Sequence, residues 1–263
     1  MYKRKWKSLD LKSKQIVKKF DGDSWREEDD FVVVETPLRI YINNSHYISL
    51  MCTPQKMEEL AIGFLFCEGV IKSYDEISSM KLEENILNIE MDKKVHAYKF
   101  KDRAMSSGCC KGSMHISLIN QNSLERVESD KVFNVKDVIS LMSGFNKYSQ
   151  LFRETGGVHS CALSDGKEVV LFAEDIGRHN ALDKVIGMAL KNNIKMDDKV
   201  LFTSGRLSSD IIIKAAGAKV PLVVSHAAPT QLGLKLAKSL NIAAAGFARG
   251  NRINLYSCFD RLK

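Results

Sequence analysis

The second half of the sequence predicts an α/β fold, an α-β-α layered domain with helices on both faces of a sheet. Short apolar runs at 159–163, 168–172, 199–202, 220–224 and 242–247 are interspersed with helix-like segments at 178–191, 207–218 and 230–240. This rhythm is typical of a largely parallel sheet. The turn residues Asp165 and Gly166 indicate that the first two of these strands form a hairpin.

The first half predicts a smaller α+β domain with an antiparallel sheet. Asn43 and Asn44 supply a turn between two strand-like runs, so these runs are expected to pair. We expect Thr53 to cap a helix with Pro54 at its first position, and Gly69 to end it. The strand candidates of this half are the runs 31–34, 38–42, 47–50, 86–91 and 95–100.

Composition places the boundary between these domains in a polar stretch at 120–131, after which Asn134 is expected to cap a further helix. The predicted organisation is a basic arm, an N-terminal α+β domain and a C-terminal α/β domain. Their ranges are 1–24, 25–131 and 132–263, with a cysteine loop at 104–113.

The net charge of +7 is confined to the start of the chain. Residues 1–20 hold eight Lys or Arg against Asp10, and the rest of the sequence is neutral. Such an arm could bind nucleic acid, but basic tails are more often simply solvated, and we do not expect nucleic-acid binding. The longest apolar run is far shorter than the roughly 20 residues of a membrane span. Six irregularly spaced cysteines and no apolar leader favour a reduced, cytoplasmic protein.

Two adjacent thiols, Cys109 and Cys110, lie among small polar residues that cannot bury them. Gly108 and Gly112 bracket them, and Lys111 adds a positive charge that favours the thiolate. An incidental turn with two cysteines is the alternative. Structural zinc needs a second pair of ligands at suitable spacing, which the sequence lacks, and a disulfide between neighbours is geometrically poor. The pattern therefore favours a nucleophilic or sulfur-carrying thiol.

Three of the predicted strands in the second half are followed by loops that join glycine to arginine. Glycine lets backbone N–H groups face an anion, and arginine grips phosphate oxygens in a bidentate manner. Since ligands bind at the carboxyl ends of parallel strands, the three loops together indicate a phosphorylated ligand. The loops contain Gly177 and Arg178, then Ser204, Gly205 and Arg206, and finally Phe247, Ala248, Arg249, Gly250, Asn251 and Arg252.

Other polar residues near these strand ends leave two interpretations open. Glu174 and Asp175 could accept hydrogen bonds from a purine or ribose, or they could neutralise Arg178. His159, His179 and His226 are more simply hydrogen-bonded structural residues than ligands, because the zinc-deaminase motifs are missing. No metal site is predicted.

Seven segments of the sequence together resemble the formate dehydrogenase accessory sulfurtransferase family, FdhD. The resemblance spans about residue 30 to the end and leaves only the basic arm outside. The segments are PLRIYIN, ELAIGFLFCEGVI, SSGC, TGGVH, EDIGRHNALDKVIG, TSGRLSSDIIIKAA and GFARGNRINLY.

This resemblance implies a function. Members of the family take persulfide sulfur from a cysteine desulfurase and deliver it to the molybdenum bis(molybdopterin guanine dinucleotide) cofactor, which is then inserted into formate dehydrogenase. It also implies that the C-terminal domain has a cytidine-deaminase-like fold without zinc. The persulfide cysteine falls on Cys109, and the C-terminal cofactor-binding segment falls on 247–252. Many members have Cys-X-X-Cys in the loop, whereas Gly112 stands at the fourth position here.

On this interpretation Cys109 is the catalytic thiol and Cys110 is a candidate second thiol. Gly108 and Gly112 would act as hinges, and the arginines of the strand-end loops would hold the pyrophosphates. The competing classes are a cofactor chaperone without sulfur transfer and a dithiol oxidoreductase. A homodimer is the default expectation for a soluble protein.

Overall fold

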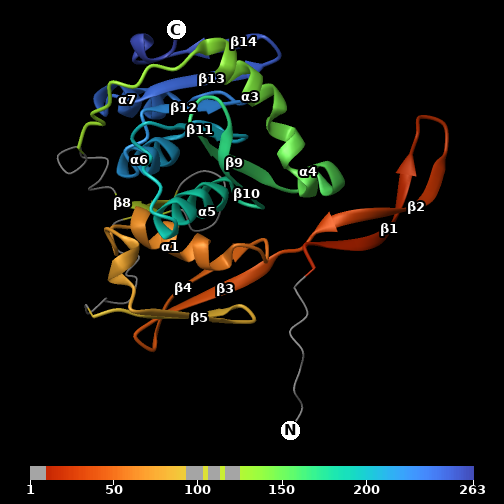
Figure 1. Ribbon diagram of the computed structural model, residues 1–263. Helices are drawn as coiled ribbons and strands as arrows, with labels where there is room; N and C mark the ends of the chain where they lie inside the picture. The colour runs from red at the N-terminus through yellow and green to blue at the C-terminus, as the bar shows by residue number, and fades with distance from the viewer. Residues whose placement is uncertain (1–9, 93–102, 106–112, 116–124) are drawn as a thin grey trace.

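The computed structural model describes residues 10–92, 103–105, 113–115 and 125–263. An N-terminal lobe (residues 36–91) and a C-terminal domain (residues 125–263) pack together through one helix from each, α1 and α5 (Figure 1). A two-stranded hairpin extends away from both. No helix in the described ranges is long and apolar enough to cross a membrane.

The C-terminal domain is built on a six-stranded sheet of order β10-β9-β11-β12-β13-β14. The five strands predicted for this half are confirmed, but the sheet is mixed rather than largely parallel. Only β11–β12 and β12–β13 pair in parallel, because a hairpin forms each edge. The strands are β9 (His159–Ser164), β10 (Val169–Asp175), β11 (Val200–Thr203), β12 (Leu222–Ser225), β13 (Ala243–Arg249) and β14 (Arg252–Leu255).

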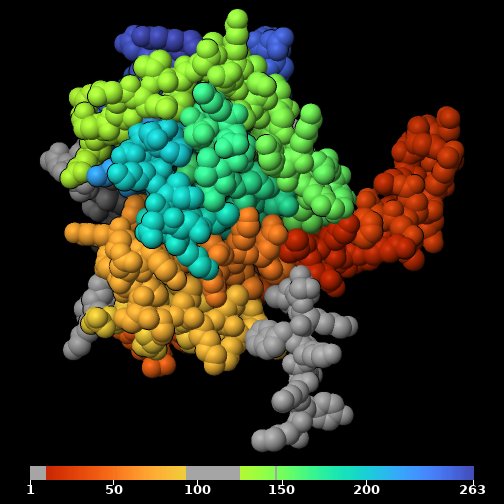
Figure 2. All heavy atoms as spheres, in the orientation of Figure 1, coloured from red at the N-terminus to blue at the C-terminus, as the bar shows by residue number. Residues whose placement is uncertain are grey.

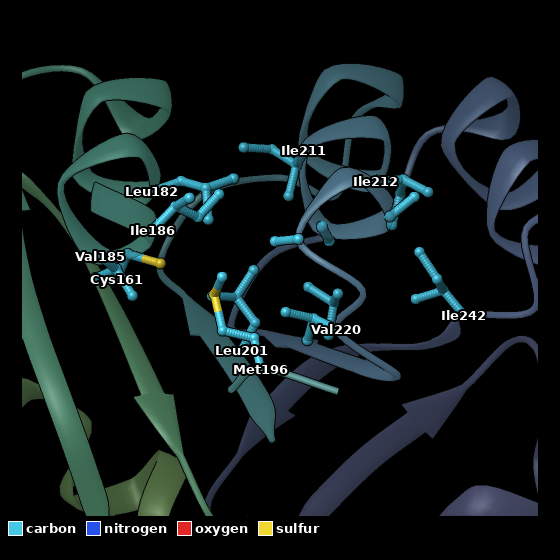
Figure 3. Close-up of a cluster of buried hydrophobic side chains, with 14 of the residues drawn as sticks. Cys161, Leu182, Val185, Ile186, Met196, Leu201, Ile211, Ile212, Val220 and Ile242 are labelled. Atoms are coloured by element: carbon cyan, nitrogen blue, oxygen red, sulfur yellow. The ribbon is translucent and has the colours of Figure 1, made fainter. Parts of the chain in front are cut away.

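Helices cover both faces of this sheet, as predicted. One face carries α5, α6 and α7, and their apolar side chains meet those of Cys161 and Leu201 in the largest core cluster (Figure 3). The other face carries α3, whose Phe145 packs against Phe202. The bounds are α3 (Val135–Tyr148), α4 (Gln150–Thr155), α5 (Arg178–Lys191), α6 (Ser209–Gly217) and α7 (Gln231–Ser239). The likeness to the cytidine-deaminase-like fold stays a prediction.

Local sequence signals explain several of these boundaries. Asn134 caps α3, since its Oδ1 accepts hydrogen bonds from the backbone N–H groups of Lys136 and Asp137 at 2.9 and 3.2 Å. Asp165 Oδ1 accepts from the backbone N–H groups of Lys167 and Glu168 in the β9–β10 turn. Val127 lies in the C-terminal core, so the chain joins this domain before residue 132.

The N-terminal lobe has a four-stranded sheet of order β4-β3-β6-β5, with α1 on it. The expectation of an antiparallel sheet is wrong at one pairing. β3 and β6 run parallel, because the chain crosses over through α1 before it forms the β5–β6 hairpin. The elements are β3 (Thr36–Ile42), β4 (Ser45–Cys52), α1 (Met57–Cys67), the 3₁₀ turn η1 (Tyr74–Glu76), β5 (Ser79–Glu83) and β6 (Ile86–Glu90).

Helix α1 begins three residues later than the sequence indicated. Lys56, in a left-handed conformation with φ of 52°, precedes its first residue, and no side chain caps it. Thr53, the expected cap, is instead buried against the C-terminal domain. The predicted strand at 95–100 lies outside the described residues.

Residues assigned to the basic arm form half of the projecting hairpin, in which β1 (Lys12–Phe20) pairs with β2 (Trp25–Val33) (Figures 1 and 2). The sequence does carry a signal for this pairing, since the lysines of β1 face a run of acidic residues. Lys14 Nζ lies 2.7 Å from Asp29 Oδ2, and Lys19 pairs with Glu28. The pairs are solvent-exposed and contribute little energy, but they fit the observed register.

The two lobes meet where α1 crosses α5, and a glycine on each helix makes the crossing close. A Cβ added to Gly63 would stand 1.8 Å from the carbonyl oxygen of Asp183. A Cβ added to Gly187 would stand 1.9 Å from the carbonyl oxygen of Glu59. Both contacts are with backbone, so a side chain at either position would force the helices apart.

We expect Gly63→Ala to lower the free energy of unfolding by about 1–3 kcal/mol, because the added methyl overpacks this crossing. Gly144→Ala on α3 is the matched control, since its Cβ would meet nothing within 4 Å. That variant should be as stable as the wild type or up to about 1 kcal/mol more stable. Urea denaturation measures both, and equal effects would contradict the close crossing.

Candidate functional site

The candidate site is the edge of the six-stranded sheet where β10, β11, β12 and β13 end and β9 begins. Four loops follow these strand ends, at 174–180, 203–209, 225–230 and 247–252. The edge therefore collects all the strand-end residues singled out in the sequence. That they bind a cofactor stays a prediction.

The loops after β10, β11 and β12 are in direct contact. Gly205 lies against the side chain of Arg178, and a Cβ on the glycine would stand 2.9 Å from Arg178 Cδ. Ser225 Oγ donates a hydrogen bond to the Gly205 carbonyl at 2.6 Å. The backbone N–H of Leu207 donates to the carbonyl of Ala228 at 3.2 Å. Glycine at 205 is thus required by the buried arginine beside it.

The third Gly-Arg segment continues this row at the turn between β13 and β14. The ring Nδ1 of His226 lies 2.7 Å from the Ala248 carbonyl oxygen, and Arg249 Nε donates to the His226 carbonyl at 3.2 Å. Phe247 and Gly250 have positive φ of 53° and 55°, so the turn bends sharply. β13 lies two strands from β11, about 10 Å at ordinary strand spacing. One extended ligand could therefore reach both loops.

The predicted arginines differ in exposure. Arg178 is buried, whereas Arg206, Arg249 and Arg252 are exposed at the same edge. Guanidinium groups bind phosphate oxygens in bidentate geometry, and three of them face solvent here. This donor set fits an anionic ligand lying across the loops.

His159, like His226, makes a hydrogen-bond contact within this edge. His159 Nδ1 lies 3.0 Å from Ser204 Oγ, and Ser204 Oγ also accepts from the Ser160 N–H at 3.0 Å. Burial, and then the nearby Arg178 and His179, lower the pKa of His159. His159 and His226 are hydrogen-bonded, as interpreted from the sequence, whereas neither ring nitrogen of His179 has a hydrogen-bond partner among the described residues.

Asp175 belongs to a fully buried ion pair that the sequence reasoning missed. Its Oδ2 lies 2.6 Å from Lys184 Nζ, and both side chains are inaccessible to solvent. The same oxygen accepts from the N–H and hydroxyl of Thr53 at 3.0 and 3.1 Å, and Lys184 donates to the Thr53 hydroxyl at 2.7 Å. Asp175 Oδ1 accepts from the Gly177 N–H and from Asn180 Nδ2, both at 2.9 Å.

The ion-pair partner of Asp175 is thus Lys184, and Glu174 accepts a short hydrogen bond from Ser149. The available signal was Lys184 itself, a charged residue among the apolar positions of α5. Because Thr53 comes from the N-terminal lobe, the network joins that lobe to the loop that carries Arg178.

Cys109 and Cys110, with Gly108, Lys111 and Gly112, lie outside the described residues. The strands on either side are described. β7 (Arg103–Met105) pairs antiparallel with β8 (Ser113–His115), and Met105 stands opposite Ser113. Met105 and Ser113, which flank the segment 106–112 in the sequence, are therefore neighbours.

The remaining thiols are poor nucleophiles. Burial raises the pKa of Cys52 to about 12, and it also raises the pKa of Cys67 and Cys161. Burial also raises the pKa of Cys258. In the described part of the chain, no group of three His, Cys, Asp or Glu side chains could hold a metal ion.

A model of the FdhD/NarQ family matches residues 33–263. The chain belongs to this family. The match confirms the resemblance drawn from the seven sequence segments, and its start coincides with the last residue of β2.

Relatives in the FdhD/NarQ family match the chain along nearly its whole length. A protein named sulfur carrier protein FdhD from Listeria innocua is 36% identical, over 97% of this chain and 100% of the relative. One of the same name from Staphylococcus haemolyticus is 37% identical, over 96% and 97%. A crystal structure from Desulfotalea psychrophila, assigned as a formate dehydrogenase accessory protein, matches with a TM-score of 0.80 and 28% identity, covering 97% of this chain and 100% of that chain.

Removing one member of the buried ion pair should be costly, because the other charge then stays buried alone. We expect Lys184→Met to lower the free energy of unfolding by about 3–5 kcal/mol. The double variant Lys184→Met, Asp175→Asn should recover part of this loss. Lys191→Met, which removes a half-exposed lysine of the same helix, should cost at most about 1 kcal/mol. Thermal unfolding of the four proteins checks this, and similar losses for both lysines would contradict it.

The pKa values also predict which cysteines react. At neutral pH we expect iodoacetamide to modify Cys109 and Cys110 in the folded protein and to spare Cys52, Cys67 and Cys161, since burial holds these three as thiols. Mass spectrometry of tryptic peptides measures the modification, and urea-unfolded protein, in which every cysteine should react, is the control. Modification of Cys52 ahead of Cys109 would contradict the assignment.

Proposed function

We propose that the protein is a sulfurtransferase, which carries persulfide sulfur from a cysteine desulfurase to the molybdenum bis(molybdopterin guanine dinucleotide) cofactor for formate dehydrogenase. The observation that carries the proposal is the family match over residues 33–263, with relatives named sulfur carrier proteins. The formate dehydrogenase part is supported by the Desulfotalea psychrophila protein.

The strand-end edge supports the ligand part of this proposal. Arg206, Arg249 and Arg252 are exposed along contiguous loops, as binding of two pyrophosphate groups would require. The cofactor is the substrate of the transfer and is held by its phosphates, while Arg178 beside Gly205 positions the loops. The turn at 247–252 would hold one end of it.

The chemistry is assigned to Cys109. Its thiolate would attack the outer sulfur of the donor persulfide, so a new S–S bond forms and the donor cysteine leaves as a thiolate. Lys111 favours the thiolate form of Cys109. The outer sulfur would then pass to the molybdenum substrate as a sulfido ligand. The S–S bond breaks, Cys109 leaves as a thiolate, and the reduced molybdenum substrate would supply the two electrons that convert the sulfane sulfur to sulfide. Cys110 is the candidate for a second carrier.

The alternative is a chaperone that binds the cofactor and hands it on without carrying sulfur. It uses the same strand-end edge but needs no reactive thiol. A dithiol oxidoreductase is less well supported, because adjacent cysteines form a disulfide with difficulty.

Incubation with a cysteine desulfurase and ³⁵S-cysteine separates these functions. We expect the wild type to gain label that dithiothreitol removes, and Cys109→Ala to gain almost none, because the accepting thiolate is gone. Cys258→Ala, which removes a half-buried thiol, is the matched control and should label normally. Non-reducing electrophoresis with autoradiography measures the label.

The same variants should then be tested for formate dehydrogenase activity in cells that lack the native protein. Loss of activity in Cys109→Ala at normal protein level supports sulfur transfer. Full activity in Cys109→Ala, or a wild type that takes up no label, favours the chaperone instead. Reduced label in Cys110→Ala would make Cys110 the second carrier.

A further inference from the structure

Polar groups without hydrogen-bond partners gather at the strand-end edge. In the part of the chain that the structure describes, the buried side-chain atoms that lack a partner all belong to the loops after β10, β11 and β12. They include both ring nitrogens of His179, Ser208 Oγ and His226 Nε2. Buried polar groups are normally paired, so such a concentration points to a ligand that supplies the missing bonds.

His179 is the most buried of these groups, with only 6% of its surface exposed. It lies in the first turn of α5, and its Nε2 is 3.5 Å from Asp210 Oδ2 in the first turn of α6. A carboxylate accepts but cannot donate, so this neighbour favours the tautomer with the proton on Nε2. Nδ1 is then a bare acceptor.

In His159 the free ring nitrogen is expected to be a hydrogen-bond donor, the opposite of the role of His179 Nδ1. Ser204 Oγ accepts a hydrogen bond from the Ser160 N–H, so its own hydrogen is available for His159 Nδ1. The proton of the neutral ring then resides on Nε2, which becomes a donor. The lowered pKa of His159 keeps the ring neutral at physiological pH.

The two rings lie near each other on one side of the sheet. His159 shares a face of β9 with Cys161, whose side chain packs in the core beneath α5 (Figure 3). His179 follows Arg178 in the first turn of that helix, and the Arg178 side chain lies against Gly205, next to the Ser204 that contacts His159. The pair therefore presents a donor and an acceptor beside Arg178.

We infer that His159 Nε2 and His179 Nδ1 recognise a cyclic lactam edge, with His159 donating to its carbonyl oxygen and His179 accepting from its adjacent N–H. This inference rests on the proposed function and deepens it, because both guanine and pterin carry such an edge. On the matching edge of adenine the roles are reversed. The amino group, a donor, would face the donor His159, and the ring nitrogen, an acceptor, would face the acceptor His179. The two histidines thus select the ligand, while the arginines bind its phosphates.

Calorimetric titration of the full chain with GDP, IDP, ADP and 6-hydroxymethylpterin tests this selection. IDP keeps the lactam edge and lacks the 2-amino group. We expect GDP and IDP to bind with similar affinity, and ADP to bind at least about 10-fold more weakly, because it loses two neutral hydrogen bonds. Equal affinity for GDP and ADP, or no binding of GDP, IDP and the pterin, would overturn the inference.

Variants separate recognition from a structural role. His179→Phe and His159→Phe should each weaken GDP about 10-fold and bring its affinity close to that of ADP, with pyrophosphate binding unchanged. His179→Asn retains an acceptor near Nδ1, and His159→Gln retains a donor near Nε2, so both should restore part of the preference for GDP. A parallel loss of GDP, ADP and pyrophosphate binding in the Phe variants would show a structural role and overturn the inference.

The pterin titration distinguishes the two sources of the lactam. If the Phe variants weaken the binding of both GDP and the pterin, the pair reads the lactam of either ring; if they weaken GDP and leave pterin binding unchanged, the pair reads guanine alone. Uptake of ³⁵S by Cys109 uses neither histidine. A wild type that takes up sulfur but does not prefer lactam ligands would therefore refute the inference and leave the proposed function standing.

Discussion

The buried pair of Asp175 and Lys184 is the constraint on which the arrangement of the candidate site depends. An isolated charge in such a place would cost several kcal/mol, so each must be matched by the other and by further hydrogen bonds. Thr53 supplies two of those bonds to Asp175 from the N-terminal lobe. The loop that carries Arg178 therefore takes its shape only when both lobes are in place.

This dependence ties both lobes to the strand-end edge. Asp175 shapes the turn through the N–H of Gly177, and Asn180 links the same carboxylate to the Met51 carbonyl of the N-terminal lobe. The Arg178 side chain lies against Gly205. Hydrogen bonds then join the loop of Gly205 to the loop after β12, and that loop to Arg249. A rigid row of this kind positions a large charged ligand without reorganising its binding groups.

Much of the fold was predictable because its signals are local. Alternation of apolar runs and helices located the strands of the C-terminal domain, and Asn134 marked the start of α3 through a bond to its own backbone neighbours. Features that depend on residues distant in the sequence were not predicted. Thr53 is a residue type that commonly caps helices, but its hydroxyl is hydrogen-bonded to Asp175 and Lys184 instead.

The sequence indicated which residues of the candidate site meet at one edge of the sheet, but not their partners. The Gly-Arg pairs come together there because the carboxyl ends of parallel strands converge whatever the rest of the sheet does. The parallel pairing of β3 with β6 depends on which strands meet in space, and no short-range pattern specifies that.

The glycine contacts between α1 and α5 bear on how this architecture can change over time. Gly63 and Gly187 each touch a backbone carbonyl of the opposite helix, and no side-chain adjustment can relieve a larger residue there. A lobe that evolved to pack against a different partner lobe is therefore not expected to fit here. The two lobes are therefore expected to be inherited together, because each carries the small residue that the other requires.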